Sequence, residues 1–184
     1  MKRIVFLVIM LFPLFVMAQN ERNKNLTKYE EFESKAGCII KYVDKSKDNC
    51  LLDKASFLKT KIRTVYGEGK NLYFLILEKN KMLGIDPSTA FIEYTDLVEI
   101  NKALARLSNE VDGDCELKPD YLQNVFTSVD GFLIGYYVEK SKATWTVRLE
   151  YGAESYTIKK IKEFADFLFN AQKEIETMIT QNSK

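Results

Sequence analysis

The sequence contains no histidine and only three cysteines among its 184 residues. The missing histidine excludes Ser-His-Asp and Cys-His catalysis, imidazole metal sites and the usual general base near neutral pH. The cysteines form no Cys-Xaa-Xaa-Cys pair, so nothing supports thioredoxin-like exchange. We therefore expect no cofactor and no bound metal, and a non-enzymatic role is favoured over catalysis.

An excess of charge of one sign is also missing, because Lys and Arg number 27 against 26 for Asp and Glu. Nucleic acid binding depends largely on basic groups that neutralise phosphates, so we do not expect a nucleic acid partner. One acidic stretch offers oxygen ligands to calcium, but its spacing does not match an EF-hand, and a solvated turn is favoured. Its carboxylates are Asp112, Asp114, Glu116 and Asp120.

Residues 1–18 have the pattern of a cleavable export signal. Two basic residues precede an apolar run from Ile4 to Val16, which is short for a membrane span of about 20 residues. Ala18 then fits a signal-peptidase site before Gln19. The alternative is an uncleaved N-terminal anchor. We expect export to the periplasm or secretion, with no membrane span after signal cleavage.

The rest of the chain suits one domain. Residues 19–30 are polar and are predicted to form a flexible lead-in, and residues 31–180 are numerous enough to build a hydrophobic core. In an oxidising compartment Cys38 and Cys50 could close a short loop as a disulfide. The alternative is that these two and Cys115 pack as small apolar groups.

Periodicity predicts an α+β fold with a curved antiparallel sheet. Phe57 to Tyr66 alternates between two faces, which indicates a half-buried strand, and Leu72 to Leu77 is an apolar run typical of a central strand. Asp130-Gly131 is a hairpin turn signal. The other predicted strands are Gly37 to Asp44, Ala90 to Tyr94, Tyr121 to Val129, Phe132 to Glu139, Ala143 to Tyr151 and Ser155 to Ile158.

Two amphipathic helices are predicted to pack on one face of this sheet. The first begins at Asp96 in a variant of the capping box, and Gly113 is expected to end it. The second covers Lys159 to Thr180 and carries Phe167 and Phe169 off its main apolar stripe. These two aromatics indicate either a second buried face or a hydrophobic patch for a partner.

The order strand, strand, strand, helix occurs twice, which indicates a tandem duplication with half-repeats over residues 31–112 and 120–180. Unrelated amphipathic segments can imitate such a repeat, because their period alone makes apolar residues coincide. A true duplication predicts two similar halves whose strands join one sheet. With an offset of 72 residues, and of 64 beyond a shorter loop, aligned pairs are Ile62 with Ile134, Tyr73 with Trp145, and Glu110 with Glu174.

Aromatic residues gather on neighbouring predicted strands. They could line a groove for a peptide, sugar or lipid, because Tyr and Trp join apolar area to a polar tip. The alternative is that they fill cross-strand pairs within the sheet. Together with the two phenylalanines of the last helix, the candidate binding residues are Tyr73, Tyr136, Tyr137, Trp145, Tyr151, Phe167 and Phe169.

We therefore predict an exported, non-catalytic binding protein that recognises another protein, in an inhibitor, immunity or chaperone-like role. The alternative is a carrier that holds a small apolar ligand in a cavity between sheet and helices. An enzyme that uses only carboxylates and tyrosines comes third. An exposed apolar patch would distinguish the first function from the second, which requires an enclosed cavity.

Overall fold

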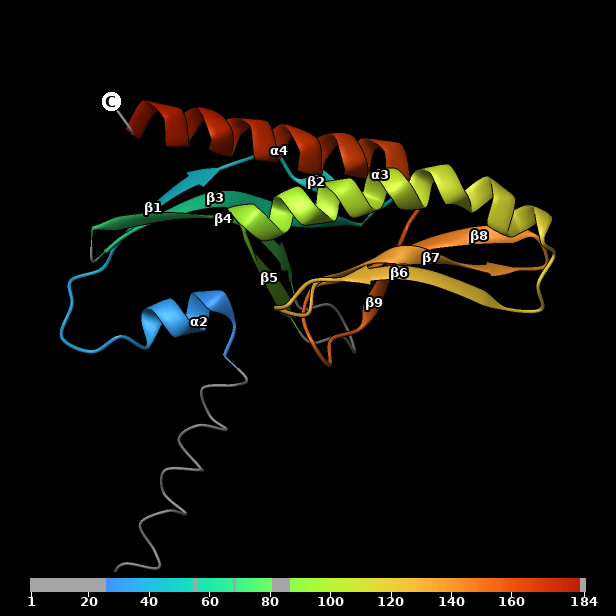
Figure 1. Ribbon diagram of the computed structural model, residues 1–184, viewed down its shortest axis with the longest axis horizontal. Coiled ribbons are helices and arrows are strands. Elements are labelled where there is room, and N and C mark those ends of the chain that lie inside the picture. Colours follow the sequence, from blue (N-terminus) through green and yellow to red (C-terminus); the bar gives the residue numbers. More distant parts are fainter. Residues whose placement is uncertain (1–25, 55, 68, 81–86, 183–184) are drawn as a thin grey trace, which may run out of the picture. The chain divides into compact units, whose positions relative to one another are not determined.

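A computed structural model describes residues 26–54, 56–67, 69–80 and 87–182 (Figure 1). The chain divides into two compact units, Met1–Gly37 and Cys38–Lys184. The predicted export signal over residues 1–18 lies outside the described residues.

The first unit contains helix α2, Lys28–Glu33, which begins with a capping box. Thr27 Oγ1 accepts a hydrogen bond from the backbone N–H of Glu30 at 3.2 Å, and the Glu30 carboxylate accepts one from the N–H of Thr27 at 2.9 Å. The box satisfies two backbone donors that a helix start otherwise leaves without partners. Helix α2 therefore begins inside the predicted lead-in.

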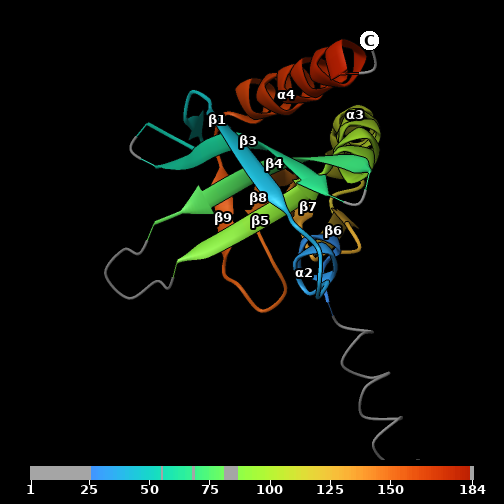
Figure 2. The same ribbon diagram turned by 90° about the vertical axis from the view of Figure 1, so that its left-hand side faces the viewer.

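The strands of the second unit form two antiparallel sheets (Figures 1 and 2). The first sheet contains, in spatial order, β1 (Lys41–Ser46), β3 (Phe57–Gly67), β4 (Lys70–Lys79) and β5 (Ser88–Glu93), and the short β2 (Cys50–Leu51) also pairs with β3. The second contains β6 (Leu122–Thr127), β7 (Leu133–Glu139), β8 (Lys142–Arg148) and β9 (Ser155–Ile158). The predicted α+β fold with antiparallel strands is confirmed, but the strands are divided between two sheets.

Strand β1 lies further along the chain than the predicted strand of residues 37–44. Its position is set by pairing with β3, where Asp44 lies opposite Arg63. The guanidinium of Arg63 donates to both carboxylate oxygens of Asp44, at 2.6 and 2.8 Å. A bidentate pair of this kind fixes geometry as well as adding attraction. The prediction took the apolar residues before β1 as part of a buried strand. Ile39 is instead 93% exposed.

Two long helices pack against the sheets: α3, Tyr94–Glu116, and α4, Ile161–Asn182. The predicted start of α3 at Asp96 is wrong, because Glu93 is the N-cap and its side chain accepts from the N–H of Thr95 at 3.0 Å. The predicted end at Gly113 is also wrong. Tertiary contacts extend the helix, since Asp114 accepts from the Tyr136 hydroxyl at 2.6 Å and Cys115 packs against the core.

Both helices contribute to one hydrophobic core. Helix α3 packs against strands of both sheets and against α4, while α4 also packs against β2. Its contact with the first sheet includes a hydrogen bond from Asn182 to the Tyr73 hydroxyl at 2.9 Å. None of the described helices is long and apolar enough to cross a membrane. The buried helix residues are Leu97, Ile100, Leu104 and Leu107 of α3, and Phe164, Leu168, Ala171 and Ile175 of α4.

The two halves of this unit have the same strand order and the same pairing register. Each half contains four strands in one chain order, followed by a helix, with β2 as an addition to the first half. The repeated order agrees with a duplication, with one strand more per half than the predicted repeat, but the strands form two sheets and not the single sheet expected. The duplication itself stays a prediction. Equivalent pairs are Lys41–Tyr66 and Leu122–Val138, Ile62–Leu75 and Ile134–Val147, and Leu75–Ile92 and Val147–Tyr156.

Candidate protein-binding groove

Three of the candidate aromatic residues lie in the core. Tyr73, Tyr136 and Trp145 are 5%, 0% and 9% exposed. Tyr136 and Trp145 face each other across β7 and β8, with ring centroids 4.9 Å apart in an edge-on arrangement. This is the cross-strand packing that aromatic residues favour in sheets. These three side chains therefore stabilise the fold and present no surface to a partner.

The other four candidates lie apart from one another. Tyr137 of β7 stacks on Tyr121 with ring centroids 6.2 Å apart. Tyr151, which follows β8, and Phe169 of α4 are 65% and 51% exposed. Phe167 of α4 is partly buried against the core. The structure thus places these residues on three different segments and does not gather the predicted set into one aromatic face.

The two cysteines of the predicted disulfide differ in burial. Cys50 of β2 is 2% exposed, and burial raises the pKa of its thiol to about 12. Cys38 is half-buried. A thiol with so high a pKa is unreactive near neutral pH. The bridge between Cys38 and Cys50 stays a prediction.

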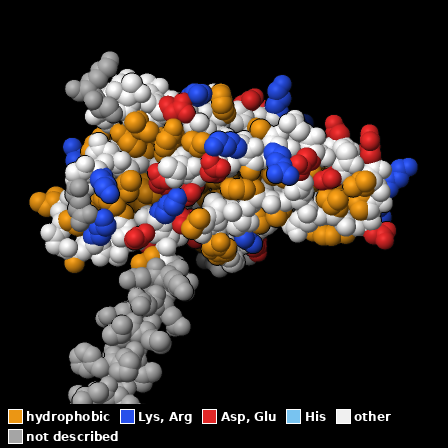
Figure 3. All heavy atoms as spheres, in the orientation of Figure 1, with side chains coloured by type: hydrophobic (Ala, Val, Ile, Leu, Met, Phe, Trp, Pro, Cys, Tyr) orange, Lys and Arg blue, Asp and Glu red, His pale blue; other side chains and the backbone are white. Residues whose placement is uncertain are grey.

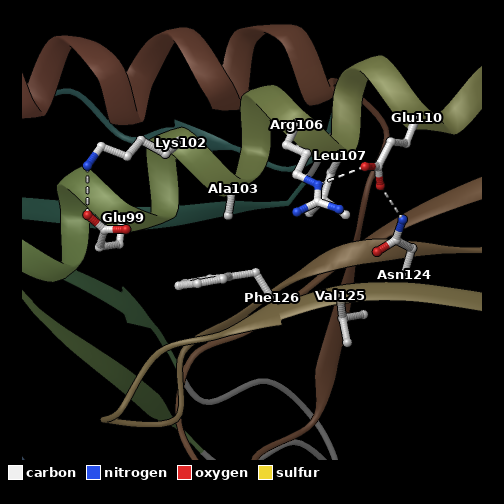
Figure 4. A pocket seen from close by; sticks show the side chains of 9 residues that line it. All are labelled: Glu99, Lys102, Ala103, Arg106, Leu107, Glu110, Asn124, Val125 and Phe126. Atoms are coloured by element: carbon white, nitrogen blue, oxygen red, sulfur yellow. Dashed lines mark hydrogen bonds and ion pairs between the residues drawn. The ribbon is translucent and has the colours of Figure 1, made fainter.

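A groove of about 420 Å³ lies between helix α3 and strand β6 (Figure 4). Its helix residues recur at steps of three and four, which places them along one side of α3. Strand β6 forms the other wall. The lining residues are Glu99, Lys102, Ala103, Arg106, Leu107 and Glu110 of α3, with Asn124, Val125 and Phe126 of β6.

The floor of the groove is apolar. Leu107 is 5% exposed, and Phe126 is partly buried against the core. Figure 4 shows the Phe126 ring beneath Ala103, so a small helix side chain leaves room above an aromatic surface. Such a floor favours apolar side chains of a ligand, because their burial removes hydrophobic area from water.

The rim of the groove is charged but internally compensated. Lys102 Nζ lies 2.8 Å from Glu99 Oε1, and Arg106 Nε lies 2.7 Å from Glu110 Oε1. Hydrogen bonds from Arg106 and then from Asn124 hold the pKa of Glu110 below its usual range. Figure 3 likewise shows acidic, basic and hydrophobic side chains interspersed on the face in view. The groove therefore offers no strong field for a ligand of one charge.

Asn124 fixes β6 against α3. Its side-chain amide donates to Glu110 at 2.9 Å, and lies 3.2 Å from the Tyr136 hydroxyl and 3.3 Å from Asp114. Burial and the hydrogen bond to Asp114 raise the pKa of Tyr136 to about 12. Sequence reasoning missed this site because the contacts join α3 to a strand beyond it in the chain. The signal available in the sequence was that β6, LQNVFT, carries no charged residue.

Strand β6 also approaches β7 closely, next to the groove. Gly135 lies opposite Val125, and a Cβ atom added to this glycine would lie 2.2 Å from the Asn124 carbonyl oxygen. That distance is far below van der Waals contact, so only glycine fits while β6 keeps its position. Gly135 is therefore a structural requirement for the strand wall of the groove.

Within the described residues, no group of three or more Cys, Asp or Glu side chains is arranged to hold a metal ion. Comparison with known proteins found no matching family model, no matching curated protein and no matching solved structure.

Proposed function

We propose that this chain is an exported, non-catalytic binding protein that recognises another protein through the groove between α3 and β6. The observation that carries the proposal is an apolar floor, formed by Leu107 and Phe126, beside an edge strand and beneath a charged rim. An apolar centre with a polar rim is the usual composition of a protein interface.

The residues of the groove support binding rather than catalysis. Its nine lining residues include no hydroxyl or thiol nucleophile, and both basic groups are paired with carboxylates. The groove also differs from the site of an apolar carrier. A carrier encloses most of its ligand in an apolar cavity, whereas this groove has a rim of four charged side chains.

Two variants, each of which replaces one alanine of α3 with arginine, test the proposal. Ala103 lines the groove, whereas Ala105 is exposed elsewhere on the same helix. Ala103→Arg should fill the groove, and Ala105→Arg adds the same side chain outside it. The mature chain and both variants would be used for affinity capture from an extract of the producing cells, followed by native mass spectrometry.

We expect a protein that is retained by the unaltered chain and by Ala105→Arg but is lost with Ala103→Arg. Retention of that protein by Ala103→Arg would contradict recognition through this groove. A lipid that is bound in place of a protein, and lost with Ala103→Arg, would identify a carrier instead.

Export is part of the proposal, and its support is the pattern of residues 1–18 in the sequence. The test is to determine the N-terminus of the protein purified from the producing cells, together with the compartment in which it is found. We expect Gln19 as the first residue, outside the cytoplasm. An intact Met1 in a cytoplasmic fraction would contradict export.

A further inference from the structure

We infer that the partner occupies the groove with an extended segment, which adds as a strand to the outer edge of β6. This inference rests on the proposed function, because it specifies how the partner binds. Edge strands present backbone N–H and C=O groups that an incoming strand can pair with, while alternate side chains enter neighbouring pockets. Helix α3 beside β6 provides that pocket.

The first half of the protein shows an extended segment beside the equivalent helix. After β1, the segment from Lys47 to Leu52 follows α4. Lys47 forms an ion pair with Glu174, and the carbonyl of Leu52 accepts from the N–H of Lys159 at 2.8 Å. Glu174 is the counterpart of Glu110, which lines the groove on α3. This segment pairs with β3, in line with β1 rather than at its outer edge, and covers this side of α4 with the protein's own chain.

The second half has no such segment of its own. Between β1 and β3 the chain has ten residues, 47–56, which include β2. Between β6 and β7 it has only five, 128–132, and these close a turn with hydrogen bonds from Ser128 to Phe132 at 2.8 Å and from Gly131 to Ser128 at 3.1 Å. The shorter connection leaves the side of α3 open where α4 is covered.

The two equivalent edge strands also differ in charge. β1, with the sequence KYVDKS, has three charged residues, whereas β6, LQNVFT, has none. Charged side chains on an edge strand oppose the addition of another strand, and a strand without them accepts one more readily. By register, Val125 of β6 corresponds to Asp44 of β1. Strand β6, whose edge borders the groove, therefore lacks the charged side chains that protect β1 against strand addition.

The groove also defines the chemistry of the segment. The helix wall from Glu99 to Glu110 is about 16 Å long at a rise of about 1.5 Å per residue, and about five residues of strand span that length. Alternate side chains facing Phe126 and Leu107 should be apolar. Because the rim charges are paired, the segment needs no net charge. It contains no proline at positions that pair with β6, since proline lacks the N–H.

The experiment uses the mature chain and a phage-displayed library of random dodecapeptides. Val125→Asp introduces the residue of the equivalent β1 position, and Val129→Asp is the control, because Val129 is exposed in the turn after β6. If Val125→Asp does not fold, Thr127→Lys replaces it at an exposed position of the same strand. Amide exchange of β6, measured by NMR with a selected peptide, reports backbone pairing.

We expect selected peptides with apolar residues at alternate positions, and slower amide exchange in β6 when they bind. Their affinity should fall about tenfold or more with Val125→Asp and stay unchanged with Val129→Asp. Peptides with apolar residues at helical spacing, or binding that Val125→Asp leaves intact, would overturn strand addition. So would a dimer of this chain that Val125→Asp dissociates, since a second copy would then be the occupant.

The outcomes separate the two proposals. If a cellular partner is lost with Ala103→Arg but retained by Val125→Asp, the partner uses the groove without strand addition, and only the present inference fails. If no protein and no peptide shows binding that depends on Ala103, the proposed function fails.

Discussion

Glu110 and Glu174 occupy equivalent positions in the two halves, and each bonds to the other half. Glu110 of α3 accepts a hydrogen bond from Asn124 of β6 at 2.9 Å. Glu174 of α4 forms ion pairs with Lys45 of β1, at 2.8 Å, and with Lys47. Each helix therefore reaches the edge strand of the half to which it does not belong. Helix α3 also packs on β4 and β5 of its own half, so the halves exchange helix contacts within one chain and their packing is mutual.

This exchange predicts that neither half folds alone. A fragment of residues 38–119 would expose the apolar stripe of α3 that packs on the second sheet, and residues 120–184 would lose that cover. We expect both fragments to lack dispersed amide signals in NMR spectra and to gain them when mixed. An isolated fragment with a native-like spectrum would contradict mutual packing.

Local pattern was sufficient to predict most elements. The alternation of residues 57–66 gave β3, and Ser155–Ile158 of β9 was predicted with its observed bounds. The sequence pattern did not predict elements whose bounds are determined by tertiary contacts. Strand β2 has only two residues, which are too few to show a periodic pattern. Helix α3 passes Gly113 because residues beyond it, such as Asp114, bond to the second sheet.

The binding surface was harder to predict than the fold. Aromatic residues favour both interfaces and buried sheet positions, and only the structure shows that Tyr136 and Trp145 are in the core. The groove depends on where α3 crosses β6, and no local period carries that information. The missing charges of β6 were visible in the sequence, but they gain meaning only when β6 is known to be an edge strand.

Glu174 should make stability depend on acid pH. Hydrogen bonds from Lys45 and then Lys47 hold its pKa below the ordinary 4.5. A group with a lowered folded-state pKa contributes its full stability above the unfolded value and loses it as pH falls through the folded value. Glu174→Gln should therefore cost about 1 kcal/mol at neutral pH, and less below pH 4.5. Urea unfolding at several pH values measures both effects.

The control for this substitution is Glu163→Gln on the same helix. Among the residues that the structure describes, Glu163 forms an ion pair only with Lys160, three residues away, and its side chain is 58% exposed. This change should leave the free energy of unfolding nearly unaltered at every pH. Equal effects of the two substitutions would show that Glu174 does not tie α4 to the first sheet.

The hydroxyl of Tyr136 should stabilise the contact between α3 and the second sheet. It donates to Asp114 at 2.6 Å, and Tyr136→Phe leaves that carboxylate without this donor. We expect a loss of about 1 to 2 kcal/mol in urea unfolding. Because the pKa of Tyr136 rises from 10.0 to about 12 on folding, the unaltered protein should also lose stability between these pH values, and Tyr136→Phe should lose less.

Tyr137→Phe provides the comparison for Tyr136→Phe. Tyr137 is the next residue on β7, is half-buried, and stacks on Tyr121 through its ring, which phenylalanine retains. Its substitution should change the unfolding free energy by less than that of Tyr136. If Tyr137→Phe is as destabilising as Tyr136→Phe, the hydrogen bond to Asp114 is not the cause.

Gly135 should be the position where one added methyl group most disturbs the groove. Its Cβ would lie 2.2 Å from the carbonyl oxygen of Asn124 and 2.6 Å from Cα of Val125, both of them backbone atoms that move only if β6 moves. We expect Gly135→Ala to cost about 2 kcal/mol in urea unfolding and to shift the NMR signals of β6.

The matched change is Gly113→Ala within α3, where nothing lies within 4 Å of the added Cβ. Because alanine loses less backbone entropy than glycine in a helix, this change should stabilise the protein by about 0.5 to 1 kcal/mol. Destabilisation by both substitutions, or by neither, would contradict a steric requirement specific to Gly135.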